Sequence, residues 1–440
     1  MSRSPLNYLG LSLSGGGYRA AAFHLGTMTK LHELRLLEKI NILSTISGGS
    51  IIGASYCLTD SAYEEFEAKM TELLSTKNVI RYILTSFAFI RFVIFILVFI
   101  YAAVHSLFTP YPYLSFIILA LMIVLIIVFQ YALFPVSKVI EEAYNKFFFS
   151  NATLSDLLDK KPSIAIGSTN IQTSRPFTFS KAEMNDSTYK KLKPPVLFNN
   201  DNFPVATAVM ASSCVPFAFT PITINAKYFV NSNDMSRANP VLVDGGVYDN
   251  QGIHKLTQRD SGFECEVVIT SDAGAGSPFK RSYNNVIVLL IRCMDVFMSR
   301  IKKFQMQEDL YRNTDFANRQ IAYISLGWDI ENCIPGFIDN LKKGQVTASV
   351  ILDHKIPPDW LANIDAHRSA IQNLLEANTN YEKIYAEKLT ATEIELARKV
   401  STNLTCLSRE QVKCLAGHAA NITELQVKLY CPTLFKSSSI

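Results

Sequence analysis

The stretch Ile40–Tyr56, INILSTISGGSIIGASY, decides the fold that this chain can adopt. Its first part, up to Ile46, is mostly apolar and predicts a buried strand, whereas the residues that follow Gly49 predict a helix. Ser47 lies at the junction, and Gly48 and Gly49 after it allow a sharp turn without a side chain colliding with a neighbouring strand or helix. A serine on a sharp turn between strand and helix is typical of a nucleophile elbow.

Alone, this pattern leaves two interpretations open. The usual elbow sequence is Gly-x-Ser-x-Gly, and Thr45 stands here in place of the first glycine. Gly-Gly-Ser runs also occur at ordinary helix N-termini and in phosphate-binding turns. The choice between these interpretations depends on two other segments.

A glycine loop near the N-terminus is the first of them. The apolar run Leu9–Leu13 leads into Ser14-Gly15-Gly16-Gly17-Tyr18-Arg19, and a helical pattern follows. Consecutive glycines let backbone N–H groups converge on one point, at the positive end of the helix. The loop lacks the spacing of a P-loop and of a dinucleotide fingerprint, so an oxyanion hole is the better fit.

The second segment is Val243-Asp244-Gly245-Gly246. Asp-Gly is also a common hairpin turn, so this segment is ambiguous by itself. Beside a nucleophilic serine, however, Asp244 can orient the Ser47 hydroxyl and accept its proton.

Together these segments resemble the patatin-like phospholipase family, in the order that the family has them, from Leu9 to about Ala275. The resemblance implies an α/β fold, a three-layer α/β/α sandwich with a mostly parallel central sheet. It implies Ser47 as the nucleophile and Asp244 as the base of a two-residue dyad. The glycine loop would form the oxyanion hole, and neither a cofactor nor a metal ion is expected. The implied oxyanion-hole residues are Gly15, Gly16 and Gly17, with motif support from Arg19, Gly48, Gly49, Gly245 and Gly246.

The implied function is a lipid acyl ester hydrolase of the phospholipase A or lysophospholipase type, acting through an acyl-enzyme. Its substrate would be a membrane phospholipid or another acyl-ester lipid. One alternative is a catalytically silent membrane scaffold or lipid-binding protein on the same fold. Another is a Ser-Asp-His triad with His254, whereas packing is the default explanation for His24. A net charge of +4 is too small to indicate nucleic acid, and no metal-ligand spacing occurs.

Two apolar runs interrupt the hydrolase motifs. They extend over about 83–108 and 114–134, and the loop Thr109–Tyr113 joins them. Their length predicts a transmembrane helical hairpin, with Arg91 either just outside the first span or reaching toward the headgroups. Lysine and arginine residues flank the hairpin on both sides and are absent from its loop, so both flanks should be cytoplasmic.

The sequence thus predicts an integral membrane protein with two spans and a catalytic domain that faces the cytoplasm. No cleavable signal peptide is recognised, and the eight cysteines have no framework spacing, so they are expected to be reduced. The expected parts are residues 1–80 and 137–335 for the hydrolase domain, 81–136 for the hairpin and 336–440 for a helical extension.

Three further elements are predicted in the second half of the chain. Ala322–Leu326 could supply a late strand, and Arg292–Lys303 forms a basic amphipathic stretch. Tyr381–Val400 and a segment that begins with the capping box Ser408-x-x-Gln411 predict two closing helices.

Overall fold

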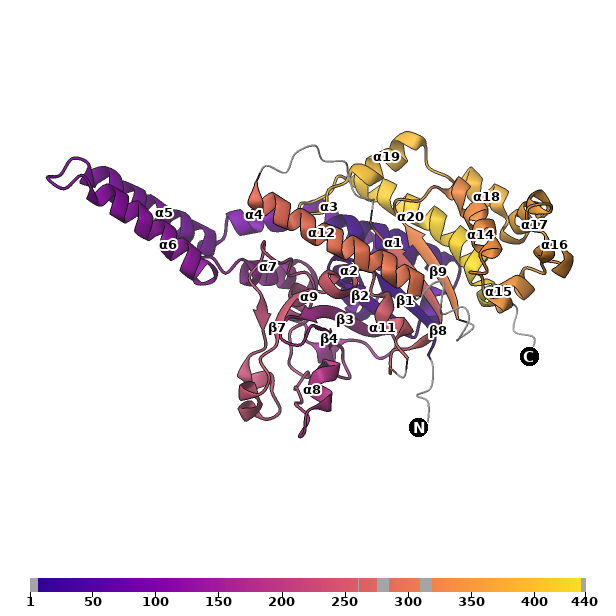
Figure 1. Cartoon of the computed structure of the whole chain (residues 1–440), viewed down its shortest axis with the longest axis horizontal. Helices are drawn as coiled ribbons and strands as arrows, with labels where there is room; N and C mark the ends of the chain where they lie inside the picture. The colour runs from indigo at the N-terminus through magenta and orange to yellow at the C-terminus, as the bar shows by residue number, and fades with distance from the viewer. Residues whose placement is uncertain (1–6, 260, 275–284, 309–318, 437–440) are drawn as a thin grey trace.

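The computed structural model describes residues 7–259, 261–274, 285–308 and 319–436, and a mixed sheet lies at its centre (Figure 1). The sheet order is β5-β4-β3-β2-β1-β8-β9, and β7 pairs with both β3 and β6. The strands are β1 (Asn7–Leu13), β2 (Ile42–Ile46), β3 (Ser163–Asn170), β4 (Arg175–Phe179), β5 (Met184–Asn185), β6 (Ile222–Thr223), β7 (Val241–Asp244), β8 (Cys265–Asp272) and β9 (Gln320–Ser325).

The five strands from β3 to β9 along this order are parallel, and the strands beyond β3 join it antiparallel. Parallel strands bring their carboxyl ends to one edge of the sheet, where sites of open α/β folds lie. Leu13 pairs with Thr45, so the glycine loop and Ser47 leave the sheet side by side. Ser168 on β3 pairs with Asp244 on β7, which brings Asp244 to the same edge.

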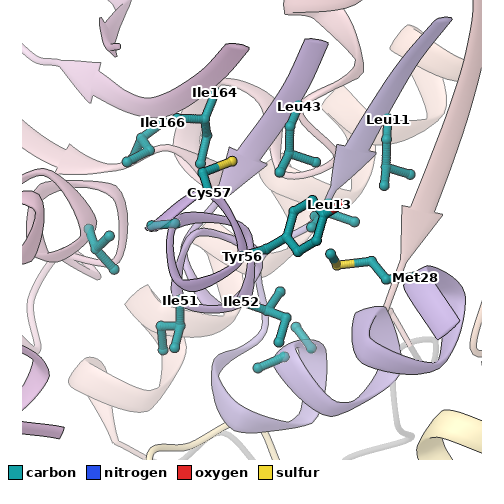
Figure 2. Close-up of a cluster of buried hydrophobic side chains, with 14 of the residues drawn as sticks. Leu11, Leu13, Met28, Leu43, Ile51, Ile52, Tyr56, Cys57, Ile164 and Ile166 are labelled. Carbon is teal, nitrogen blue, oxygen red and sulfur yellow. The ribbon is translucent and has the colours of Figure 1, made fainter. Parts of the chain in front are cut away.

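A thick helical layer covers one face of the sheet. Leu11, Leu43 and Ile164 point from three adjacent strands toward Ile52 and the neighbouring side chains of α2, as Figure 2 shows. These side chains are almost fully buried, and burying apolar surface is the main driving force for this packing. The helices that build the layer include α1 (Gly17–Glu33), α2 (Gly48–Leu58), α3 (Tyr63–Thr76), α9 (Val205–Ser212) and α20 (Arg409–Tyr430).

The opposite face carries a thinner layer. The short helix α11 (Ile253–Thr257) packs there on β1, β2 and β8, around a small core that includes Leu256, Cys265 and Val268. Helix α12 (Val286–Gln305) contacts α10 (Gly246–Asp249). The predicted α/β fold with a mostly parallel sheet is therefore confirmed, with unequal layers. Helix α8 (Ser187–Lys191) lies against β4.

The predicted hairpin projects away from the body (Figure 1). Helices α5 (Phe87–Ser106) and α6 (Leu114–Leu133) are long and apolar enough to cross a membrane, and 6% and 0% of their apolar windows are buried. The first helix of the hairpin begins at Phe87 and not at the predicted limit of about residue 83. Residues Val79–Leu84 form a separate helix, α4, packed on α7 (Val136–Tyr144), because Ser86 accepts a hydrogen bond from the Phe89 amide and starts α5 anew.

Arg91 lies in the second turn of α5. Its guanidinium donates hydrogen bonds to the carbonyls of Ala132 and Leu133, both 3.2 Å away. These carbonyls belong to the last turn of α6, where a cation is stabilised by the helix dipole. Arg91 thus links the two ends of the hairpin.

The C-terminal region is helical, and α14 to α18 enclose a second core with part of α20. The strand β9 and the capping box at Ser408 are confirmed. The single helix predicted over Tyr381–Val400 is instead two helices, because Thr390 and Glu393 form a capping box that starts the second one. The helices are α14 (Cys333–Lys342), α15 (Ala348–Asp353), α16 (Pro358–Ala362), α17 (Arg368–Thr379), α18 (Tyr381–Ala386) and α19 (Ala391–Lys399).

Two helical glycines should respond in opposite ways to alanine. A Cβ atom on Gly26 of α1 would lie 2.0 Å from the Ala416 carbonyl of α20, whereas one on Gly336 of α14 would meet nothing within 4 Å. We expect Gly26→Ala to lower the free energy of unfolding by about 1–3 kcal/mol. We expect Gly336→Ala to raise it by about 0.5 kcal/mol through helix propensity. Thermal unfolding of both variants checks this, and a stabilised Gly26→Ala would contradict the packing of α1 on α20.

Candidate active site

Ser47 occupies a strained position between β2 and α2. Its backbone has φ 49° and ψ −114°, a region that residues other than glycine rarely adopt. The Ser47 amide donates a hydrogen bond to Ser212 Oγ, 2.9 Å away, and the residue is 7% exposed. Ser212 Oγ donates in turn to the Gly167 carbonyl at 2.6 Å. The α9 terminus therefore holds the turn in place.

The glycines of the elbow are required by close backbone approach. A Cβ atom on Gly48 would lie 2.2 Å from the Gly17 carbonyl oxygen, and one on Gly49 would lie 2.4 Å from the Leu13 carbonyl oxygen. The missing first glycine of the motif has a local explanation. Thr45 fits because Gly53, one helical turn into α2, leaves room for its methyl group; a Cβ there would lie 2.6 Å from Thr45 Cγ2.

The glycine loop lies against Ser47 but does not present three equivalent amides. The Gly15 amide donates to the Asn250 carbonyl at 3.0 Å, so it is not free to bind an oxyanion, contrary to the prediction from the motif. Gly16 and Gly17 have φ values of 142° and 59°, which only glycine adopts readily. Their amides have no hydrogen-bond partner among the described residues, and they lie at the N-terminus of α1.

Arg19 lies beside this loop, with Nη2 3.7 Å from the position of a Cβ atom on Gly16. Its guanidinium donates to the Val400 carbonyl at 3.2 Å, and burial lowers its pKa from the usual value. The side chain therefore ties the first turn of α1 to the C-terminal helical region. The resemblance gives Arg19 as motif support, and in the structure it makes a hydrogen bond that reaches from α1 to Val400.

Asp244 ends β7 and faces Ser47. Its amide donates to the Cys214 carbonyl at 2.8 Å, and its own carbonyl accepts from Thr169 Oγ1 at 2.9 Å. The Gly246 amide donates to Asp244 Oδ1 at 2.7 Å, and the Ser47 hydroxyl hydrogen-bonds the carboxylate. Burial raises the pKa of Asp244 to about 7, although both hydrogen bonds act in the opposite direction.

The glycines of the Asp244-Gly245-Gly246 motif, like those of the elbow, are required by close approach of neighbouring atoms. A Cβ atom on Gly245 would lie 2.5 Å from the Gly167 carbonyl oxygen, and one on Gly246 would lie 2.6 Å from Asn250 Oδ1. Met298 of α12 also lies against Gly246, with its methyl group 3.0 Å from that position. Helix α12 therefore approaches the site.

Sequence reasoning missed three residues that position the site. Ser212 and Asn250 hold the elbow and the glycine loop, and the Asp249 carboxylate accepts from the amides of Gln251, Gly252 and His254 at 2.8–3.1 Å. Asp249 followed by a glycine-containing turn is a signal for such a side-chain cap. Ser212 acts on a residue far away in sequence, so no local pattern indicates its role.

The two histidines that the sequence singled out lie apart from Ser47. His24 is fully buried, with Nδ1 2.8 Å from Ser271 Oγ and Nε2 2.9 Å from the Ser14 carbonyl oxygen, and burial lowers its pKa to about 4. The His254 ring packs on Tyr248 and lines a cavity beside α11. The Asp244 carboxylate thus faces the Ser47 hydroxyl without a histidine between them.

Comparisons with known proteins bear on this arrangement. A family model described as patatin-like phospholipase matches residues 11–257. No curated protein matches the sequence. Similar solved structures include VipD from Legionella pneumophila, at 14% identity over 100% of this chain and 93% of that chain, with a TM-score of 0.33. Human GIVD cytosolic phospholipase A2 with methyl gamma-linolenyl fluorophosphonate is similar at 11% identity over 99% and 59%, with a TM-score of 0.45. The family match includes the glycine loop, the elbow and Asp244.

Replacing Asp244 by asparagine should change stability with pH in a defined direction. Between an unfolded pKa of 3.8 and a folded pKa of about 7, folded Asp244 binds a proton that the unfolded chain lacks. Its stabilising effect is complete below the lower value and is lost as pH rises through the higher one. Asp244→Asn, which is neutral throughout, should match wild type near pH 4 and be more stable above pH 7, by up to about 4 kcal/mol.

Melting temperatures of the two proteins, measured from pH 4 to pH 8, check this expectation. Glu395→Gln serves as the control, because Glu395 is a solvent-exposed carboxylate of α19. A difference between Asp244→Asn and wild type that does not vary with pH would contradict the buried, proton-binding state of Asp244.

Proposed function

This chain belongs to the patatin-like phospholipase family, and from that premise we propose that it is a membrane-anchored lipid acyl ester hydrolase. The family consists of serine hydrolases that act on ester bonds. The observation that carries the proposal is the hydrogen bond between the Ser47 hydroxyl and the buried Asp244 carboxylate. Phospholipase A and lysophospholipase activities are the proposed reactions.

In the proposed reaction, Asp244 accepts the hydroxyl proton while Ser47 Oγ attacks the ester carbonyl. The protonated Asp244 then donates that proton to the departing alcohol, which leaves an acyl-enzyme on Ser47. Water attacks this ester while Asp244 takes one of its protons, and Asp244 returns that proton to Ser47 Oγ as the fatty acid leaves. A base with a pKa near the working pH is effective in both directions of proton transfer, and the raised pKa of Asp244, about 7, meets that condition.

The amides of Gly16 and Gly17 are the proposed oxyanion donors. They have no partner among the described residues and lie at the positive end of a 17-residue helix, next to the elbow. One such donor typically contributes about 3 kcal/mol to transition-state stabilisation. Gly15 has a supporting role in this proposal, because its amide fixes the loop to Asn250.

Helices α5 and α6 are the proposed anchor. Large apolar side chains such as Phe87, Phe116 and Ile127 are 79%, 77% and 64% exposed, which a bilayer accounts for and water does not. Lysines and arginines flank the hairpin on both sides, which favours a cytoplasmic hydrolase domain. An enzyme held this way would draw its lipid substrate from the membrane that anchors it.

A silent lipid-binding scaffold on the same fold is the second candidate. It predicts the same anchor and the same fold without turnover. The strained Ser47 backbone and the costly burial of Asp244 favour the enzyme, because a scaffold gains nothing from either.

A fluorophosphonate probe should label the wild-type protein at Ser47. Detergent-purified Ser47→Ala should lose labelling and fatty-acid release entirely, and Asp244→Asn should lose about 10²–10⁴-fold in rate. Ser61→Ala, a change of an exposed serine outside the site, should behave like wild type. The labelling rate should rise with pH up to an inflection near pH 7. A folded wild-type protein that neither reacts nor releases fatty acid would favour the scaffold.

Removal of the hairpin should release the protein from membranes without abolishing probe labelling. The hairpin ends lie close together, since the Phe89 and Phe134 rings are 5.8 Å apart, so a short Gly-Ser linker can replace residues 87–133. We expect full-length protein to resist alkaline extraction and the shortened protein to be extracted. A full-length protein that alkaline buffer extracts would contradict the anchor.

The orientation can be measured on the same full-length protein through two exposed cysteines, Cys293 and Cys406. A membrane-impermeant maleimide should label them in lysed cells and leave them unlabelled in intact cells. Labelling in intact cells would contradict a cytoplasmic domain.

A further inference from the structure

A cavity lies beside the active site, between β4, α8 and α11. It has a volume of about 260 Å³, and we call it the basic cleft. Four of the residues that line it carry the argument: Arg175, Thr178, His254 and Lys255. The last three and Tyr248 also line a smaller cavity of about 30 Å³ that reaches Gly245. The proposed hydrolase chemistry uses none of the four.

The charge in the basic cleft is positive once internal pairs are removed. Three cationic side chains, Arg175, Lys190 and Lys255, line it together with the carboxylates of Glu183 and Asp186. Glu183 pairs with Lys190. Asp186 is satisfied locally, because its two oxygens accept four hydrogen bonds, from Asn170, Thr173, Thr188 and Tyr189.

Arg175 and Lys255 remain without a carboxylate in ion-pair contact, although Glu183 interacts with Lys255 electrostatically and the centroid of the Phe263 ring lies 5.1 Å from the Lys255 ammonium. Neither makes an ion pair with any of the described residues. Burial lowers the pKa of Lys255 to about 8, and burial together with Lys255 and Arg175 lowers the pKa of His254. Burial is the largest cause in both groups, and for Lys255 the nearby Glu183 offsets it only in part, so the charged form of Lys255 is poorly solvated in the cleft.

A buried hydroxyl without a hydrogen-bond partner is a second, independent indication that the basic cleft binds a ligand. Thr178 is 3% exposed, is the fourth residue of the five-residue strand β4 and lines both cavities. Its Oγ1 atom is buried and has no hydrogen-bond partner among the described residues. A buried hydroxyl without a partner costs free energy, and valine would fill the same volume without that cost.

We propose that the basic cleft binds the phosphate group of a phosphomonoester. A phosphate offers several acceptor oxygens at once, so it can accept from the Arg175 guanidinium, the Lys255 ammonium and the Thr178 hydroxyl together. The group can be carried by a lipid headgroup or by a soluble molecule, and both present the same chemistry to the cleft. This site is independent of the proposed hydrolase reaction.

Thermal unfolding of the full-length, detergent-purified protein with increasing inorganic phosphate tests the proposal. The Ser47→Ala protein is the background, so hydrolysis plays no part. Chloride at equal ionic strength corrects for screening. Binding to the folded state should raise Tm with phosphate concentration. Arg175→Gln and Lys255→Met should each weaken the apparent affinity about tenfold or more.

Thr178→Val separates a ligand site from a merely structural one. Without phosphate, this variant should melt at or above the Tm of its parent, because no hydrogen bond is lost. Its phosphate response should nevertheless weaken several-fold. Lys191→Met is the matched control, because Lys191 is an exposed lysine of α8 outside the cleft, and it should respond like the parent.

The source of the phosphate is distinguished with two further probes. Glycerol 3-phosphate represents a soluble phosphomonoester, and mixed micelles of phosphatidylcholine with phosphatidic acid represent a lipid one, with phosphatidylcholine alone as the blank. A Lys255-dependent rise in Tm with only one probe identifies that source. No rise with any phosphate probe, or an equal rise in Lys255→Met and the parent, would overturn the proposal.

Discussion

The close approach of the glycine loop to the elbow is the constraint on which the site depends. The Gly17 carbonyl lies where a side chain on Gly48 would begin, and the Asn403 carbonyl lies where one on Gly17 would begin. Three chain segments therefore meet through backbone alone. This contact leaves Ser47 on a turn that must adopt a positive φ, and the α9 terminus stabilises that turn through Ser212. The strain at Ser47 is therefore held by two contacts, one with the glycine loop and one with Ser212.

The electrostatics of the site follow from the same packing. Asp244 is enclosed by β3, the α9 terminus and Gly246, so its charged form is poorly solvated. Folding therefore favours a proton on Asp244, whereas the proposed reaction needs that proton to leave and return. A pKa of about 7 reconciles these demands, because neither form is costly near neutral pH. Burial of the carboxylate lowers stability, but the same burial raises the pKa of Asp244 and so makes it a more effective base.

Local sequence predicted much of this arrangement. The order strand, glycine turn, helix at Gly15 and Ser47 follows from apolar runs and glycine positions, and the parallel sheet follows from repeating it. The sequence could not predict which amides of the glycine loop already have a hydrogen-bond partner. The Gly15 amide donates to the Asn250 carbonyl, and Asn250 lies far along the chain. The role of Ser212 could not be predicted for the same reason. The first limit of the hairpin was misplaced because apolar residues before Ser86 look alike whether they pack on α7 or face lipid.

The hairpin interrupts the hydrolase domain at a point that its own geometry makes tolerable. Its ends are joined by Arg91 and by the contact of Phe89 with Phe134. The chain therefore leaves the hydrolase domain and returns to it at nearly the same place. Helix α7, which follows the hairpin, packs on α9, and α9 ends at the serine that holds the Ser47 amide. Two crossings of a bilayer return the chain to the side it left, which is what Ser47, before the hairpin, and Asp244, after it, require in order to meet. A single span at this position would separate them, so the proposed anchor and the observed approach of Ser47 to Asp244 are compatible because the insertion is a hairpin.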